Sequence, residues 1–310
     1  MLGILIDTCR GESTGGVILL DRWNGRAATA ALVTPLTASG AIDVAKMCAH
    51  AGNVLGRGLD AVVPFGTTGE GASFGVAEKQ AALQALMKSG VPADRIIAGV
   101  MATSVEDTVL FIDKALGWGC AGVLVPPPFY YHGAATNGVV RWYTQVIERL
   151  GSRARDIILY HIPSVTGVNV GPAAVGELQR RFGKVVAAVK DSSGDQGTTE
   201  ALLALGSVPV MVGHEGYLAA MIRKGAVGTI SGLANIVPER IARMVRTGEE
   251  DAAFAPAVDA VVSLPVVPAV RAVLAHVVGD AAWAEPAPPL EKLTRAQANG
   301  LVERWNALMK

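Results

Sequence analysis

Short apolar runs rich in Val, Ile and Ala recur along this chain at intervals of roughly 25 residues. Most of them lead into a polar, turn-forming stretch, and amphipathic segments typical of helices fill the intervals between them. The runs lie at residues 30–36, 60–65, 95–101, 121–127, 156–162, 184–190, 208–213 and 226–231. Their alternation with helical segments predicts eight parallel strands, each followed by a helix.

Two of the intervening segments carry the ends expected of helices. SVEDTVLFIDKALGWG (104–119) opens with the Ser-x-x-Asp capping pattern, and VPERIARMVRTG (237–248) ends with a basic residue and then glycine. The 310 residues fit one α/β domain, a (β/α)8 TIM barrel with a C-terminal helical region. An open doubly wound sheet would need a GxGxxG fingerprint after its first strand, and the sequence has none.

The pattern also divides the chain. Residues 1–27 precede the first repeat and form an N-terminal extension to which the sequence assigns no role. Residues 28–250 form the catalytic barrel, and residues 251–310 read as helices only. We expect this last part to pack on the barrel or to build an oligomer interface.

Charge and hydropathy exclude several classes of partner. Lys plus Arg equals Asp plus Glu at 27 each, so no basic field indicates nucleic acid or an anionic membrane surface. The longest apolar stretch (254–278) is interrupted by Asp259, Ser263, Arg271 and three prolines, which argues against a membrane span. The start MLGILIDTCRGE lacks the basic region of a signal peptide. A small-molecule partner is therefore expected.

The cysteines indicate a compartment. Cys9, Cys48 and Cys120 stand far apart with no CxxC pair, which predicts reduced thiols and a cytoplasmic protein.

The candidate functional residues follow the strands, because TIM barrels carry their sites at the C-terminal ends of the strands. The motifs at these positions are GTTGEG (66–71), PPPFYYHG (126–133), YHIPSVTG (160–167), VKDSSGD (189–195), GHEG (213–216) and TISG (229–232).

Lys190 is the most informative of these residues. It ends the apolar run VVAAV, so its amine sits at the edge of buried structure, where a desolvated amine is more often unprotonated and can attack a carbonyl to form a Schiff base. Tyr160 lies near the end of the preceding strand, within reach across strands about 4.8 Å apart, and its hydroxyl can carry protons. The alternatives are a surface lysine neutralised by Asp191 and a tyrosine that is only a core aromatic.

The remaining motifs carry weaker signals. GTTGEG offers backbone N–H groups and two hydroxyls that can hold the carboxylate of a 2-oxo acid, or it is simply a tight turn before a helix. The five histidines show no HxH or HExxH spacing, so no metal site is expected. Glu215 beside His214 either touches substrate or belongs to a solvated loop.

Together, GTTGEG, PPPFYY, LYHIPSVTG and VKDSSGD, in this order on successive strand ends, resemble the dihydrodipicolinate synthase/N-acetylneuraminate lyase family of class I aldolases. The resemblance runs from about residue 28 to the C-terminus. It implies a TIM barrel with C-terminal helices, a homotetramer built as a dimer of dimers, and catalysis without a metal or an organic cofactor.

The resemblance also implies roles for individual residues. Lys190 matches the lysine that forms a Schiff base with pyruvate or another 2-oxo acid, and Tyr160 matches the tyrosine that relays protons. Thr67 and Thr68 match the pair that holds the carboxylate, with Thr67 also in the proton relay. Tyr130 resembles the tyrosine that reaches into the neighbouring subunit's site, where it is expected to join the proton relay of Tyr160 and Thr67.

Other positions are expected to line the substrate pocket. Gly213 and Ile230 fall where the family surrounds pyruvate. Synthases of the family typically read Tyr-Asn-x-Pro-x-Arg-Thr-Gly where this chain reads YHIPSVTG, so Val165 replaces the arginine that grips the aldehyde's carboxylate. A valine cannot donate a bidentate hydrogen-bond pair. We expect Val165, Glu215 and Gly232 to shape the part of the pocket that selects the second substrate.

These features predict a Schiff-base lyase or aldolase acting on pyruvate or a pyruvate-derived 2-oxo acid, such as a 2-keto-3-deoxy sugar acid. The alternatives are the 4-hydroxy-tetrahydrodipicolinate (dihydrodipicolinate) synthase of lysine biosynthesis, a dehydratase or deaminase of a related 2-oxo acid, and a non-catalytic 2-oxo acid sensor. His161, in place of the usual asparagine, leaves the specificity open.

Overall fold

The computed structural model of the chain describes residues 21–23 and 25–310. Of the expected N-terminal extension, residues 1–27, residues 1–20 and 24 lie outside the described residues. The boundaries expected at residues 28 and 250 stay predictions, although the first strand begins at Ala27 and the last helix before the C-terminal region ends at Thr247.

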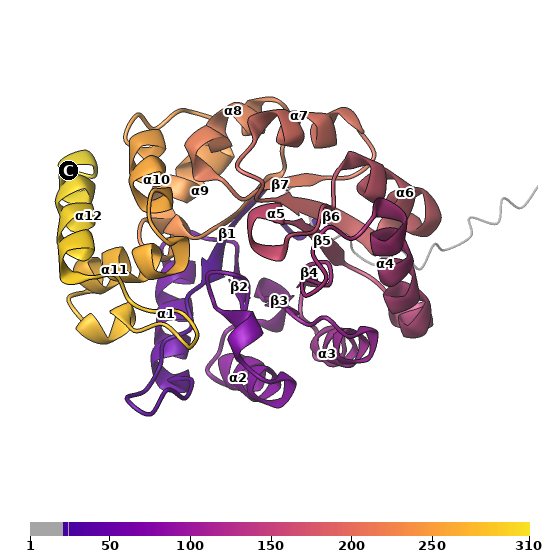
Figure 1. Cartoon of the computed structure of the whole chain (residues 1–310), viewed down its shortest axis with the longest axis horizontal. Coiled ribbons are helices and arrows are strands. Elements are labelled where there is room, and N and C mark those ends of the chain that lie inside the picture. The colour runs from indigo at the N-terminus through magenta and orange to yellow at the C-terminus, as the bar shows by residue number, and fades with distance from the viewer. Residues whose placement is uncertain (1–20, 24) are drawn as a thin grey trace, which may run out of the picture.

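Parallel strands form the centre of the molecule (Figure 1). They are β1 (Ala27–Leu32), β2 (Ala61–Pro64), β3 (Ile97–Gly99), β4 (Gly122–Val125), β5 (Ile157–His161), β6 (Val186–Asp191), β7 (Val210–Val212) and β8 (Gly228–Ser231). Hydrogen bonds join them in the order β2-β1-β8-β7-β6-β5-β4-β3. An isolated parallel bridge between Val62 and Ile96 links β2 to the start of β3, so the sheet is a nearly closed barrel. The expected TIM barrel is confirmed.

Helices surround this barrel. They are α1 (Val44–Gly56), α2 (Val76–Lys88), α3 (Val105–Gly117), α4 (Thr136–Leu150), α5 (Pro163–Thr166), α6 (Pro172–Phe182), α7 (Gln196–Ala204), α8 (Leu218–Arg223) and α9 (Pro238–Thr247). The expected helix ends are present, since Ser104 Oγ accepts from the Asp107 amide 3.1 Å away and Gly248 ends α9 with φ of 69°. Side-chain capping and left-handed glycine set these boundaries.

The first strand lies earlier in the chain than its sequence run suggested. The apolar run at 30–36 includes Pro35, which has no amide hydrogen to donate to a ladder. The structure places β1 at Ala27–Leu32, where small residues pair with β2 and β8.

Side chains alternate between the inside of the barrel and its outer shell. Along β5, Ile158 and Tyr160 belong to the cluster that fills the barrel, while Leu159 packs in the outer core against the helices. Along β6, Ala188 points inward and Val189 outward. Because the strand period is two residues, Lys190 shares the inward face with Ala188.

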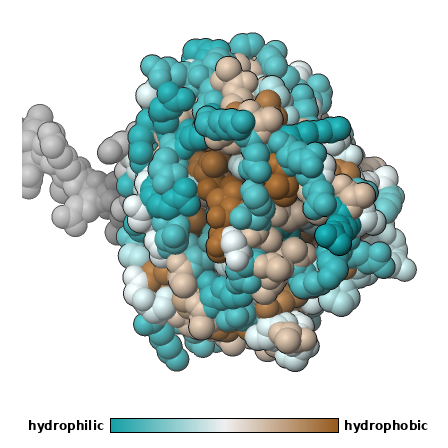
Figure 2. All heavy atoms as spheres, turned by 90° about the vertical axis from the view of Figure 1, so that its left-hand side faces the viewer, coloured by the Kyte–Doolittle hydropathy of each residue, from teal (hydrophilic) through white to brown (hydrophobic). Residues whose placement is uncertain are grey.

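The C-terminal region contains α10 (Phe254–Val262), α11 (Val266–Val278) and α12 (Arg295–Leu308). α10 lies beside α9 and α11 beside α1, and α12 packs on α10 and α11 at the outer edge (Figure 1). Figure 2 looks onto this side and shows hydrophobic side chains gathered in a hollow framed by hydrophilic ones. Val277 and Val278, half-exposed at the end of α11, line a surface cavity with Leu274. None of the helices within 21–23 and 25–310 has the length and apolar character needed to cross a membrane.

A buried ion pair ties α11 to the barrel. Arg271 is fully buried and bonds the carboxylate of Glu70, in the loop after β2. Its guanidinium also donates to the carbonyls of Thr34 (2.6 Å) and Trp283 (3.2 Å). Burial raises the pKa of Glu70 in spite of the opposing charge of Arg271. The carboxylate therefore depends on its partner to remain ionised.

Removing one member of this pair should be strongly destabilising. Arg271→Met leaves the Glu70 carboxylate buried without a cation, and we expect the free energy of unfolding to fall by about 3–5 kcal/mol. Urea denaturation measures this change. The double variant Glu70→Gln with Arg271→Met should lose less than Arg271→Met alone, and an equal or larger loss would show that the charge is not the cause.

Candidate active site

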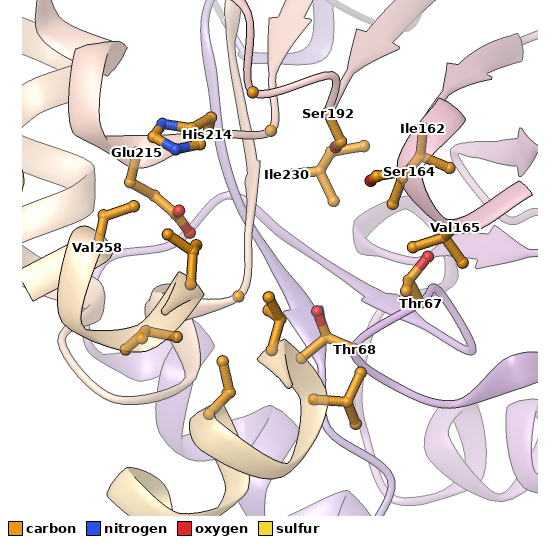
Figure 3. A pocket seen from close by; sticks show the side chains of 18 of the residues that line it. Thr67, Thr68, Ile162, Ser164, Val165, Ser192, His214, Glu215, Ile230 and Val258 are labelled. Atoms are coloured by element: carbon orange, nitrogen blue, oxygen red, sulfur yellow. The ribbon is translucent and has the colours of Figure 1, made fainter. Parts of the chain in front are cut away.

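The C-terminal ends of the strands open into a pocket of about 420 Å³. It receives side chains from the loops after β2, β5, β6, β7 and β8 and from α10 and α11. Figure 3 shows Glu215 and Val258 on one side of this pocket and Ser164 and Val165 on the other, with Thr68 between them at its lower edge. All the residues expected from the sequence to form the site line this pocket, except Tyr130.

Lys190, Tyr160 and Thr67 form a chain of polar groups inside the barrel mouth. Tyr160 and Lys190 are register partners on β5 and β6, and both side chains are buried. Lys190 Nζ donates to Tyr160 Oη at 3.1 Å, and Tyr160 Oη lies 3.1 Å from Thr67 Oγ1. Nζ also sits 4.3 Å from the centre of the tyrosine ring. An amine, a phenol and a hydroxyl in series can bind a carbonyl carbon and move protons beside it.

The loop after β2 is folded tightly against its own strand. A Cβ on Gly71 would lie 2.0 Å from the Phe65 carbonyl oxygen, so glycine is required for this close approach. In the part of the chain that the structure describes, the amides of Thr67 and Thr68 donate to no acceptor. Together with the two hydroxyls, these amides can hold a small carboxylate.

The loops after β7 and β8 form the opposite edge of the pocket. A Cβ on Gly213 would lie 2.0 Å from Ser192 Oγ, so glycine lets this loop approach the end of β6. Ile230 belongs to the barrel interior and Gly232 lies beside Thr68. Glu215 is held by Oε1, which accepts from Ser231 Oγ (2.6 Å) and the Leu233 amide (3.2 Å).

Val165 and Tyr130 are both strongly exposed. Val165 lies on α5 at the pocket edge with 59% of its surface exposed. Tyr130 is 79% exposed on the loop after β4 and packs edge-to-face on Tyr131 with ring centres 5.2 Å apart. It contributes nothing to this chain's own pocket, and its role toward a neighbouring subunit stays a prediction.

The structure adds pocket residues that the sequence did not single out. Ser164 and Ser192 follow β5 and β6 and point into the pocket (Figure 3). Both serines belong to motifs at strand ends, YHIPSVTG and VKDSSGD, but the sequence does not show that their side chains point inward. The geometry of the turns sets that direction. The helices α10 and α11 supply the largest addition, which consists of Val258, Val261, Val262, Val266, Val267 and Val270.

His161 is buried next to the site but does not line the pocket. It follows Tyr160 on β5, and its Nδ1 accepts from the Val170 amide at 3.1 Å. Its Nε2 lies 4.0 Å from the buried carboxylate of Asp191. Burial lowers the pKa of His161, and the Asp191 charge opposes this shift. The imidazole is therefore neutral in the folded protein near pH 7.

Acidification should weaken the fold through buried histidines. The folded-state pKa of His161, like that of His50, lies below the 6.5 of the unfolded chain, so the unfolded state binds more protons once the pH falls below 6.5. We expect the melting temperature to fall between pH 7.5 and pH 5.5. His161→Asn should reduce the slope without removing it, because His50 remains. An unchanged slope would exclude His161 as a contributor.

Comparison with known proteins decides the family. The model of the dihydrodipicolinate synthetase family matches residues 25–275. The chain belongs to this family. It is 33% identical to 4-hydroxy-tetrahydrodipicolinate synthase of Geobacter sulfurreducens over 214 residues, which cover 68% of this chain and 71% of that protein. The family resemblance inferred from the motifs is thereby confirmed.

Solved structures of family members and of an aldolase have the same fold as this chain. Dihydrodipicolinate synthase from Agrobacterium tumefaciens superposes with a TM-score of 0.90 at 36% identity, covering 92% of this chain and 99% of that one. A variant of 2-keto-3-deoxygluconate aldolase from Sulfolobus solfataricus shares the fold with a TM-score of 0.76 at 20% identity, over 91% and 96% of the two chains. As a member of the dihydrodipicolinate synthetase family, the chain is an enzyme of the lyase and aldolase class.

Proposed function

We propose that this enzyme is a Schiff-base lyase or aldolase in which Lys190 binds pyruvate or a pyruvate-derived 2-oxo acid as an iminium. The observation that carries the proposal is the chain Lys190 Nζ, Tyr160 Oη and Thr67 Oγ1, joined by two contacts of 3.1 Å inside the pocket. Relatives named as synthase and aldolase support the same chemistry.

The reaction can be written with these groups. Lys190 Nζ attacks C2 of the 2-oxo acid, the carbonyl oxygen leaves as water, and an iminium forms. Loss of a proton from C3 gives an enamine, whose carbon attacks the carbonyl carbon of an aldehyde and forms a C–C bond. The aldehyde oxygen takes up a proton, and one water then hydrolyses the iminium to release Lys190. No electrons are gained or lost overall, and cleavage is the same sequence reversed.

The other residues have roles that follow from their positions. Thr67 and Thr68 bind the carboxylate of the 2-oxo acid through amides and hydroxyls. Tyr160, with Thr67, carries the protons to and from the carbinolamine. Gly213, Ile230 and the residues near them surround the pyruvate portion.

The assembly and the compartment also belong to the proposal. We propose a homotetramer, a dimer of dimers, in which the exposed Tyr130 enters the neighbouring subunit's site; its 79% exposure supports this. Cys48 and Cys120 are free thiols, which supports a cytoplasmic enzyme.

Borohydride trapping tests the central step. Incubation with pyruvate, reduction and peptide mass spectrometry should find the added mass on Lys190. Absence of an adduct on folded protein would favour the non-catalytic 2-oxo acid sensor. A coupled assay with pyruvate and aspartate semialdehyde separately tests the lysine-biosynthetic synthase activity.

A further inference from the structure

The pocket has one wall that the barrel does not supply. α10 and α11 line it with a set of side chains that are all valine, namely Val258, Val261, Val262, Val266, Val267 and Val270. Val262 and Val266 are 45% and 46% exposed, so they present their methyl groups at the opening. This valine wall faces Val165 on the other side of the pocket, as the position of Val258 in Figure 3 illustrates.

Charged side chains are few in the pocket, although the hydroxyls of Ser164 and Ser192 and the imidazole of His214 also line it. Among the described residues that line the pocket, Lys190 is the one lysine or arginine, and Glu215 is the one carboxylate. In the proposed reaction the Lys190 nitrogen becomes the iminium, whose positive charge is opposed by the C1 carboxylate of the 2-oxo acid, and it is uncharged in the enamine that attacks the aldehyde. A second carboxylate or a phosphate on the substrate would then be desolvated with no second lysine or arginine opposite it and with Glu215 nearby, which is unfavourable.

The space available exceeds what pyruvate needs. A second cavity of about 540 Å³ shares Thr67, Tyr160 and Val165 with the first and continues past them. Its further walls are again largely apolar, with Met101 and Phe129 among them. Pockets of a few hundred cubic ångströms hold ligands well beyond the size of a three-carbon acid.

We infer that the second reactant, the aldehyde or the equivalent C4 substituent of the 2-oxo acid, is an uncharged group rich in hydrocarbon. The valine wall removes this group from water on one side and Val165 does so on the other. The inference rests on the proposed function and narrows its substrate class. It places an apolar aldehyde ahead of a carboxylated or phosphorylated one.

Matched aldehydes test this directly. With pyruvate held in excess, 4-methylpentanal and succinate semialdehyde differ in carrying an isopropyl group or a carboxylate of the same shape. We expect kcat/KM for formation of the 4-hydroxy-2-oxo acid to favour 4-methylpentanal by at least about tenfold. Equal or greater kcat/KM with succinate semialdehyde overturns the inference.

A pair of double variants identifies the surface responsible. Val262→Thr with Val266→Thr keeps the side-chain shapes but adds hydroxyls to the valine wall, and should lower kcat/KM for 4-methylpentanal about tenfold. Val277→Thr with Val278→Thr changes two valines of similar exposure outside the pocket and should leave it unchanged. Equal effects of the two double variants would also overturn the inference.

Borohydride trapping with pyruvate alone distinguishes failure of the valine-wall inference from failure of the proposed Schiff-base function. An adduct on Lys190 in the native chain and in both double variants, combined with a failed aldehyde preference, refutes the valine-wall inference and leaves the Schiff base standing. No adduct in the native chain refutes the proposed function itself.

Discussion

Lys190→Ala is expected to reduce turnover of any 2-oxo acid substrate by at least about 10⁴-fold, because Lys190 is the one lysine among the described residues that line the pocket. Lys190 is 4% exposed and contacts the Tyr160 hydroxyl, so the smaller side chain removes the amine from a site that stays otherwise in place. Steady-state assays measure the loss, and borohydride reduction with pyruvate should give no adduct. Full activity in this variant would refute the mechanism.

Lys79 provides an internal control for the labelling experiment. It is also buried, and burial lowers its pKa to about 8, so its amine is comparatively easy to deprotonate. Its Nζ, however, lies outside the pocket and donates to the carbonyl of Val100, the residue after β3, at 2.6 Å. If added mass appears on Lys79 as readily as on Lys190, trapping reports reactivity of buried amines and not the geometry of the site.

Tyr160→Phe is expected to slow turnover by ~10² to 10⁴, the range for loss of a general acid–base group. The ring remains to pack in the barrel, but the hydroxyl between Lys190 and Thr67 is gone. Adduct formation on Lys190 should still occur, although more slowly. Single-turnover kinetics with pyruvate separate these steps.

Tyr143→Phe is the matched control. Tyr143 is equally buried, and its hydroxyl donates to the Val125 carbonyl at 2.8 Å outside the pocket. Its loss should lower stability by about 1–3 kcal/mol, because the Val125 carbonyl loses its partner. Turnover should fall far less than in Tyr160→Phe, although the Tyr143 hydroxyl also contacts the Tyr160 backbone. Comparable slowing in both variants would mean that Tyr160 matters for packing alone.

The barrel and the centre of the site were predictable because they depend on local periodicity. Short apolar runs mark buried parallel strands, and the chemistry of a barrel gathers where those strands end. Tyr160 and Lys190 could be paired from the sequence, since both end neighbouring strands and the two-residue period sets their faces. The first strand was predicted a few residues too late, at 30–36 instead of Ala27–Leu32. Apolar composition alone does not take into account that Pro35 has no amide hydrogen for the strand ladder.

The valine wall and the Arg271–Glu70 pair could not be predicted in the same way. Both depend on how α11 packs over the barrel, and no local signal in VVPAVRAVLAHVV fixes that placement. Arg271 looked like an interruption of an apolar stretch, whereas it is the anchor of that stretch. His161 likewise gave no hint that its ring would accept from the Val170 amide.

The attachment of α11 through Arg271 bears on how such an enzyme diversifies. Val270, which precedes Arg271, belongs to the valine wall. Glu70, which pairs with Arg271, lies in the same loop as Thr67 and Thr68. The residues that react with the 2-oxo acid and the valines that contact the second reactant therefore come from different parts of the sequence. The Arg271–Glu70 ion pair holds these two parts together. Substitutions in the valine wall would then change which second reactant is accepted, while Lys190, Tyr160 and Thr67 stay in place.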